Sequence, residues 1–165
     1  MSATLARSGR PFDRDVLAAA DRWGAGRCGV ALLDRDGLVA ERGSRDVALA
    51  WASVTKVASA LTVLRLAELG RISLDEPAGP PGATVRHLLA HASGLSFEEP
   101  VVVSPPERTR IYSNAGFDAL AAHVEARAGT SFGRLVRELV LGPLGMSGAA
   151  LAGPASQGMH GTLRD

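Results

Sequence analysis

Two pairs of residues in this 165-residue sequence have the types and spacings needed for nucleophilic catalysis. Ser53 precedes Lys56 by three positions, and Tyr112 precedes Asn114 by two. The lysine, the tyrosine and the asparagine are each the only residue of that type in the chain, whereas serine occurs 13 times. Both spacings together would arise by chance about once in two thousand such sequences.

The first pair predicts a serine nucleophile with a lysine base. On a helix, a spacing of three places Ser53 and Lys56 on one face, one turn apart, so that a proton can pass between them. Ser53 would begin the helix, where its backbone N–H could donate to an oxyanion. A lysine is protonated in neutral water, so a lysine base must be buried or lie at the positive end of a helix dipole. We expect both conditions for Lys56.

Each pair also has a structural interpretation. Ser53 could cap a helix while Lys56 extends to water. Tyr112 could be a half-buried aromatic residue, and Asn114 could cap a helix over residues 115–127. Because the two pairs occur in one chain, the sequence favours the catalytic interpretation, although we expect Asn114 to act as a cap as well.

Periodic patterns predict the elements that would position these residues. The N-terminal half favours a helix at 11–23, with Phe12 on its apolar face, then a hairpin with strands at 28–33 and 38–41. A helix at 54–69 is apolar nearly all round and should therefore lie in the interior. Shorter helical patterns cover 85–89, capped by Thr84, then 117–124 and 132–140, whereas residues 142–161 are rich in Gly, Ala and Pro and show little periodicity.

Composition favours one folded domain. With 46% hydrophobic and 21% charged residues, the chain can bury an ordinary core. Its 18 basic and 17 acidic residues form no basic stripe, so no nucleic-acid partner is expected. No apolar run approaches about 18 residues and no signal-peptide core follows Arg7 and Arg10, so we expect a cytoplasmic protein without a membrane partner. The single Cys28 rules out an intrachain disulfide.

With these motifs the sequence resembles the serine β-lactamases, penicillin-binding proteins and related esterases. The similarity runs in order through residues 52–56, 66–75, 85–95, 112–114 and 143–146. Tyr-x-Asn as the second motif is similar to the branch that holds class C β-lactamases, D-alanyl-D-alanine carboxypeptidases and esterases.

The resemblance implies acyl transfer through a covalent serine ester. Ser53 would attack the carbonyl of a small-molecule ester, amide or β-lactam-like substrate while Lys56 takes its proton. Tyr112 would carry protons to the leaving group and activate the deacylating water, and Asn114 would bind the acyl side of the substrate and hold Lys56. The resemblance implies no metal and no organic cofactor.

The resemblance also implies an incomplete α+β fold of the β-lactamase/transpeptidase type. The family's third motif, Lys or His followed by any residue and Gly, has no match before Asp165, and we expect His160-Gly161-Thr162 to be a loop. Residues 1–76 would form part of the α/β lobe, with an N-terminal helix, a two-stranded hairpin and the nucleophile helix. Residues 77–165 would form the helical lobe. The C-terminal strands and helix of the family's α/β lobe would be missing.

Two further expectations follow from this incomplete fold. A chain with only two strands and an exposed sheet edge should be either marginally stable or self-associating. The alternative to a hydrolase is a truncated or degenerate family member that binds a ligand or partner without turnover.

His87 and His91 have the helical spacing of a metal-ligand pair. They lack the intervening glutamate of His-Glu-x-x-His and any obvious third ligand. We therefore expect both histidines to serve in packing and expect no metal site.

Overall fold

The computed structural model describes the backbone of residues 3–5 and 11–165 and the side chains of residues 15–165. The chain divides into two compact units. One unit runs from the N-terminus to Leu49 and also includes Gly161–Asp165, and the other, which we call the helical unit, spans Ala50–His160. These units are not the two lobes expected on either side of residue 76, and that division stays a prediction.

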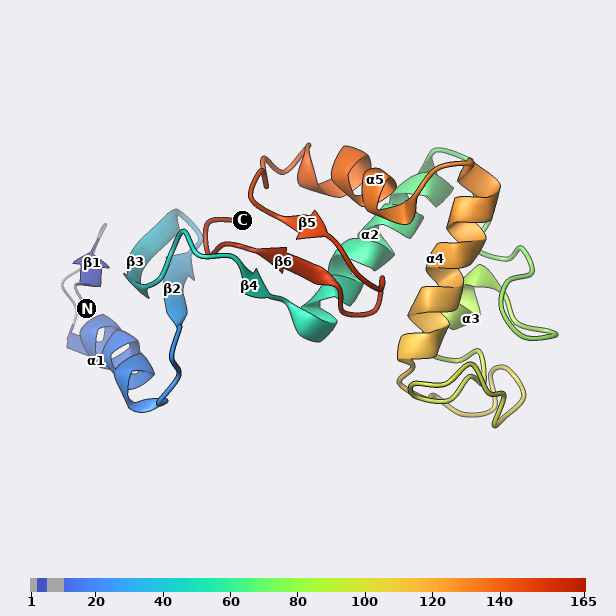
Figure 1. The fold of residues 1–165 in the computed structure, drawn as a ribbon, viewed down its shortest axis with the longest axis horizontal. Coiled ribbons are helices and arrows are strands. Elements are labelled where there is room, and N and C mark those ends of the chain that lie inside the picture. The colour runs from blue at the N-terminus through green and yellow to red at the C-terminus, as the bar shows by residue number, and fades with distance from the viewer. Residues whose placement is uncertain (1–2, 6–10) are drawn as a thin grey trace. The chain divides into compact units, whose positions relative to one another are not determined.

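The described residues of the N-terminal unit form a sheet and a helix. Its elements are β1 (Ala3–Leu5), α1 (Pro11–Ala19), the 3₁₀ turn η1 (Ala20–Arg22), β2 (Gly29–Asp34) and β3 (Gly37–Gly43) (Figure 1). The three strands are antiparallel in the order β1-β3-β2. The first helix and the hairpin are confirmed, but the expectation of two strands is wrong, because β1 adds to β3. The side chain of Phe12 lies outside the described residues.

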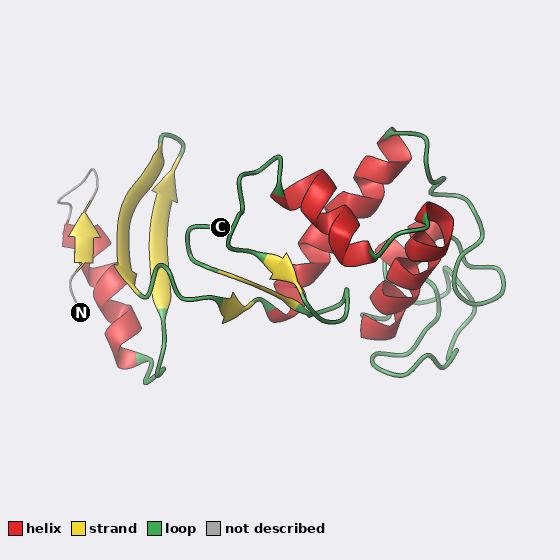
Figure 2. Cartoon of the chain, turned by 45° about the horizontal axis from the view of Figure 1, so that its top comes forward, coloured by secondary structure: helices red, strands yellow, loops and turns green. Residues whose placement is uncertain are grey.

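The helical unit holds most of the helices and a second, smaller sheet. Its elements are the 3₁₀ turn η2 (Ala52–Val54), α2 (Thr55–Glu68), α3 (Val85–Leu89), α4 (Asn114–Ala128), α5 (Phe132–Val136), the π-helical turn η3 (Arg137–Leu141) and β5 (Ala150–Leu151). Strands β4 (Leu49–Ala50) and β6 (Met159–Gly161) lie at the ends of the unit, and each extends one residue beyond it. The sheet has the order β4-β6-β5 (Figure 2). Within the described part of the chain, no helix is long and apolar enough to cross a membrane.

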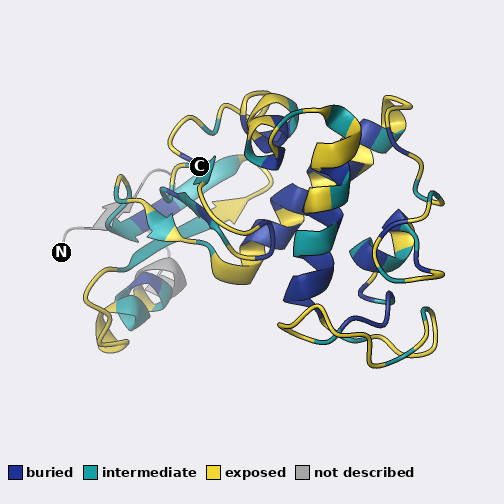
Figure 3. Ribbon diagram, turned by 45° about the vertical axis from the view of Figure 1, so that its right-hand side comes forward, coloured by how far each residue is buried: buried dark blue, intermediate teal, exposed yellow. Residues whose placement is uncertain are grey.

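The core of the helical unit lies where α2, α4 and α5 meet. Side chains from these helices are at most 1% exposed there, among them Val63, Leu66, Leu120, Val124 and Leu135. Figure 3 shows this burial as a dark blue face along the helices. The periodic apolar positions that predict these helices are therefore the positions that pack.

The buried face of α2 differs from the expectation. The polar residues Thr55, Ser59 and Thr62 are at most 1% exposed, whereas Val57 and Leu61 on the other side are 61% and 45% exposed. The polar stripe is buried because its hydroxyls have partners. Thr55 Oγ1 accepts a hydrogen bond from the Met159 N–H, and Ser59 Oγ donates one to a backbone carbonyl. The helix is thus buried on its polar stripe and not on all sides.

Residues 142–161, which show little periodicity in the sequence, contain a short hairpin. Strands β5 and β6 pair antiparallel, with Ala150 opposite His160. The expectation that His160-Gly161-Thr162 is a loop is wrong for His160 and Gly161, which lie in β6. Strands of two or three residues have too few positions to show a period, so only the pairing of the folded chain reveals them.

The first prediction concerns the core. We expect Leu66→Ala to lower the free energy of unfolding by about 2–5 kcal/mol, because the fully buried side chain leaves a cavity. Leu69→Ala, at a leucine that is 48% exposed, should change it by no more than about 0.5 kcal/mol. Urea unfolding followed by circular dichroism measures both values. Equal losses would contradict the packing of α2.

Candidate active site

Ser53 lies in the tight turn that leads into α2. The turn η2 is 3₁₀-helical, and its Val54 N–H donates to the Trp51 carbonyl at 3.0 Å. Ala52, directly before Ser53, has a φ of 45°, in the left-handed region that side chains other than glycine seldom adopt. Such strained residues are concentrated at functional sites. Ser53 itself is exposed.

Lys56 is buried beside this serine. Its side chain is on the first turn of α2, the residue is 6% exposed, and Nζ lies 3.3 Å from Ser53 Oγ. Nζ also donates to Asn114 Oδ1 at 2.6 Å and to the Ser156 backbone carbonyl at 2.8 Å. Among the side chains that the structure describes, no carboxylate pairs with this amino group. Three neutral oxygens therefore hold Lys56.

The partly exposed ring of Tyr112 lies against the Lys56 amino group. Lys56 Nζ lies 4.7 Å from the centre of its ring, within range of a cation–π interaction, and the residue is 41% exposed. The Ser53 hydroxyl first, then the Lys56 amino group, lower the pKa of the Tyr112 phenol below its ordinary value. A phenol with a lowered pKa gives up its proton more readily.

Asn114 contributes its side chain to the site and does not cap α4. The cap is Ser113, whose Oγ accepts the Gly116 N–H at 2.8 Å. The expectation that Asn114 is the cap is therefore wrong. As the first helical residue, Asn114 directs Oδ1 to Lys56 and Nδ2 to Glu98 Oε2 at 2.7 Å.

Glu98 is a site residue that sequence reasoning missed. Its carboxylate accepts from the Asn114 amide, which in turn accepts from the Lys56 amino group. With a donor on one side and an acceptor on the other, the amide has only one orientation that satisfies both. Asn114 also separates the carboxylate from the lysine, whose charge Glu98 would otherwise stabilise directly.

Ser156 and Asp118 also belong to the surroundings of Lys56, since Ser156 contacts the lysine and Asp118 contacts Ser156. Ser156 supplies the third oxygen through its backbone carbonyl, and its N–H and Oγ both donate to the Asp118 carboxylate. Neither residue belongs to a motif or to a periodic apolar pattern, so the sequence offered no signal for them. They enter the site through the β5–β6 hairpin and α4.

His91 contacts the segment that carries Tyr112 and Ser113. Its ring lies 4.5 Å from the Tyr112 ring, and its Nδ1 accepts the Ser113 N–H at 3.0 Å. Burial, followed by the charges of Arg110 and Lys56, lowers the pKa of His91. The neutral ring is the form that can accept this hydrogen bond.

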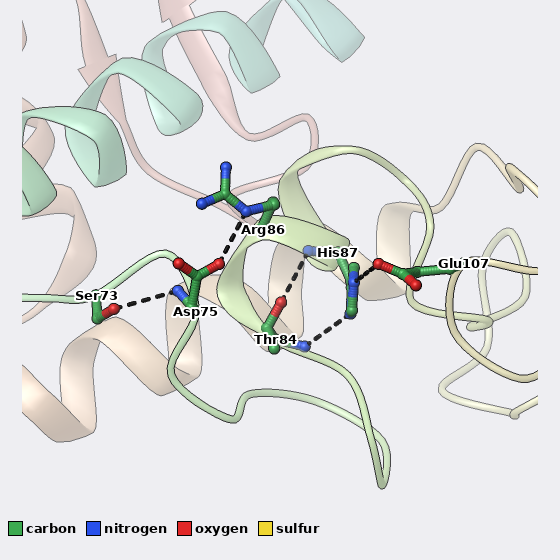
Figure 4. Close-up of polar contacts among 6 residues, drawn as sticks. All are labelled: Ser73, Asp75, Thr84, Arg86, His87 and Glu107. Carbon is green, nitrogen blue, oxygen red and sulfur yellow. Dashed lines mark hydrogen bonds and ion pairs between the residues drawn. The ribbon is translucent and has the colours of Figure 1, made fainter.

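His87 has a separate, local role. Thr84 and His87 cap α3 reciprocally: the Thr84 N–H donates to His87 Nδ1 at 3.2 Å, and the His87 N–H donates to Thr84 Oγ1 at 3.4 Å (Figure 4). His87 Nε2 contacts Glu107 Oε1 at 2.8 Å. Over the described residues, no three His, Cys, Asp or Glu side chains are grouped as metal ligands would be.

The structure thus brings together all four site residues expected from the sequence. An exposed hydroxyl lies beside a buried amine, a phenol of lowered pKa and a fixed amide. This set can move a proton off the hydroxyl and onward to a leaving group, which is the chemistry of covalent acyl transfer. The role of each residue stays a prediction.

Comparison with known proteins identifies the relatives of the chain. The beta-lactamase family model matches residues 18–163. A beta-lactamase structure from Mycobacterium bovis is 39% identical, with a TM-score of 0.86. Two more distant structures share the fold: a beta-lactamase/D-alanine carboxypeptidase from Yersinia pestis (23% identity, TM-score 0.75) and a D-stereospecific amidohydrolase from Streptomyces (19% identity, TM-score 0.77). No curated protein matches the sequence.

The alignments cover most of this chain but less of its relatives. They include 90% of the chain and 56% of the Mycobacterium bovis protein, and 90% and 64% for the Yersinia pestis protein. For the Streptomyces protein the shares are 92% and 68%. The chain therefore spans a little over half the length of the first of these relatives.

The Tyr112 environment gives the second prediction. Because the chain has one tyrosine, the absorbance of tyrosinate reports the ionisation of Tyr112 alone. We expect its midpoint below 10.0 in the folded protein, and closer to 10.0 in Ser53→Ala and in Lys56→Met. Arg127→Met, which removes a positive charge that pairs with Glu76, is the control and should leave the midpoint unchanged. A wild-type midpoint of 10.0 or higher would refute the assignment.

The third prediction concerns His91 and acid stability. Its folded pKa is lowered, so below pH 6.5 the unfolded chain binds a proton that the folded chain resists, and the stability falls as the pH drops. We expect wild type to lose more unfolding free energy than His91→Asn between neutral pH and about pH 5, because asparagine does not titrate and tolerates the left-handed backbone of residue 91. Urea unfolding at both pH values measures the difference, and parallel losses would disprove it.

Proposed function

The chain belongs to the beta-lactamase family, and on that basis we propose that it is a serine hydrolase that forms an acyl-enzyme at Ser53. The observation that carries this proposal is the contact of the buried Lys56 amino group with the exposed Ser53 hydroxyl at 3.3 Å. A serine hydroxyl is a weak nucleophile until an adjacent base takes its proton. Lys56 lies within reach of that proton.

The proposed reaction begins at this contact. As Ser53 Oγ forms a bond to the substrate carbonyl carbon, its proton passes to Lys56 Nζ. The bond to the leaving group then breaks, and Tyr112 returns a proton to that group. The lowered pKa of Tyr112 supports this relay, because the phenol can both give up and recover a proton in contact with Ser53 and Lys56.

The second half of the reaction uses the same groups. Water, deprotonated by Tyr112, would attack the ester carbonyl; the bond to Ser53 Oγ would then break, Oγ would take back its proton from Lys56 Nζ, and the acid would be released. Asn114 would hold Lys56 in place throughout and donate its second amide hydrogen to the acyl side of the substrate, since Glu98 takes only one of the two.

We propose small esters or amides, including β-lactam-like amides, as the substrate class. Two proteins that share the fold, a beta-lactamase/D-alanine carboxypeptidase and a D-stereospecific amidohydrolase, bear names that describe amide hydrolysis, which supports the proposal at the level of the fold. This chain spans 56% of the length of its Mycobacterium bovis relative, and the proposed activity refers to this chain.

A fluorophosphonate probe gives the fourth prediction. We expect it to label Ser53, since the probe bonds covalently to activated serines. Trypsin cleavage at Arg45 and Lys56 isolates residues 46–56, in which Ser53 is the only serine, so mass spectrometry can locate the added mass.

Matched variants test the assignment. Ser53→Ala and Lys56→Met should abolish labelling, whereas Ser147→Ala, which removes another exposed serine hydroxyl, should retain it. Absence of the mass from residues 46–56 in wild type would reject the hydrolase and favour the alternative, a family member that binds without turnover.

A further inference from the structure

The Asp118 carboxylate is tied to the active site through one backbone carbonyl. We propose that Asp118 is a positioning residue for Lys56: by holding Ser156, it directs the Ser156 carbonyl at the lysine and so turns the lone pair of the neutral amine toward Ser53. The inference rests on the proposed function, because it explains how Lys56 is made ready to act as the base.

Both oxygens of the Asp118 carboxylate bind Ser156, and we call this pair of hydrogen bonds the Asp118 clamp. The Ser156 N–H donates to Asp118 Oδ1 at 2.9 Å, and Ser156 Oγ donates to Asp118 Oδ2 at 3.1 Å. Ser156 is fully buried, and its carbonyl lies 2.8 Å from Lys56 Nζ. With N–H and hydroxyl both bound to one carboxylate, Ser156 is held at the position from which its carbonyl reaches Lys56 Nζ.

The chemistry of the three oxygens around Nζ decides where the lone pair lies. A neutral amine has two N–H bonds and one lone pair. The amide oxygen of Asn114 and the carbonyl of Ser156 can only accept, whereas the hydroxyl of Ser53 can donate. The two N–H bonds therefore point to the two obligate acceptors, and the lone pair faces the Ser53 proton. When that proton moves, the O–H bond breaks, an N–H bond forms, and the oxygen electron pair is free to attack the substrate.

Helix α4 thus supplies one obligate acceptor and holds the residue that supplies the other. Asn114 reaches the lysine directly, and Asp118, four residues later on the same face, reaches it through Ser156. The hairpin loop that carries Ser156 is also tied to α2, since Ser59 Oγ donates to the Ala155 carbonyl at 2.7 Å. Of these ties, only the Asp118 clamp holds Ser156 itself.

The single lysine makes the position of Lys56 directly measurable. In a protein labelled with ¹³C-lysine, all labelled side-chain carbons belong to Lys56. The chemical shift of the carbon bonded to Nζ is the signal to follow. It should be displaced from the free-lysine value by the rings of Tyr112 and Phe117, 4.7 and 5.8 Å from Nζ. We expect Asp118→Ala to move this signal toward the free-lysine value and to slow fluorophosphonate labelling of Ser53 about 100-fold, the effect of a small misplacement of a catalytic group.

Two variants separate positioning from general stability. Asp118→Asn keeps an acceptor for the Ser156 N–H and should restore the wild-type lysine signal and most of the labelling rate. Glu125→Ala removes a carboxylate from the same helix that also accepts a backbone N–H, that of Phe132 at 2.7 Å, and should leave both measurements unchanged. An Asp118→Ala protein with the wild-type signal and rate would overturn the proposal.

Two further outcomes also decide whether Asp118 positions Lys56. If Asp118→Ala does not fold, Ser156→Ala, which loses only the hydroxyl contact, should shift the signal and the rate in the same direction by a smaller amount, and unchanged values would overturn the proposal. If the lysine signal responds to Asp118→Ala but Ser53 is never labelled in wild type, the positioning stands while the proposed hydrolase fails.

Discussion

The buried amino group of Lys56 is the constraint on which the rest of the helical unit depends. An amino group removed from water needs hydrogen-bond partners within the protein. Three segments far apart in the sequence supply them: the turn with Ser53, the start of α4 with Asn114, and the hairpin loop with Ser156. The packing of α2 against α4 and the β5–β6 hairpin therefore forms the core and completes the site together.

Polar contacts then extend outward from this centre in two directions. On one side Asn114 leads to Glu98, and on the other Ser156 leads to Asp118. Both carboxylates stay one residue removed from the lysine, so they fix its neighbours without pairing with its charge. That separation is compatible with a lysine that must release and accept a proton, since a direct carboxylate partner favours the charged form.

The arrangement of α2 follows from the same requirement. Its polar stripe faces the interior because Thr55 and Ser59 bind the backbone around the β5–β6 hairpin, and the apolar residues Val57 and Leu61 are left exposed. The hydrophobic pattern alone predicts burial on nearly all sides and does not show that the polar stripe is buried with Val63 and Leu66. Burial of polar side chains costs little when every one of them has a partner, and the nucleophile is then presented from a helix that is held firmly on its polar side.

Local spacing and resemblance predicted much of the site. The pairing of Ser53 with Lys56 follows from helical geometry over three residues, the helices and the first hairpin follow from apolar periodicity, and the resemblance placed Tyr112 and Asn114 beside them. These features depend on neighbours in the chain or on motifs that can be read directly.

Only the tertiary structure decided which oxygens hold Lys56 and which face of α2 is buried. The contacts of Lys56 with Asn114 and Ser156 span 58 and 100 residues, and Glu98, Asp118 and Ser156 belong to no motif or periodic pattern. The short strands β5 and β6 and the cap at Ser113 also escaped the sequence. The physical reason is that such contacts depend on how helices and strands pack, and packing joins residues whose types and spacings carry no mutual signal.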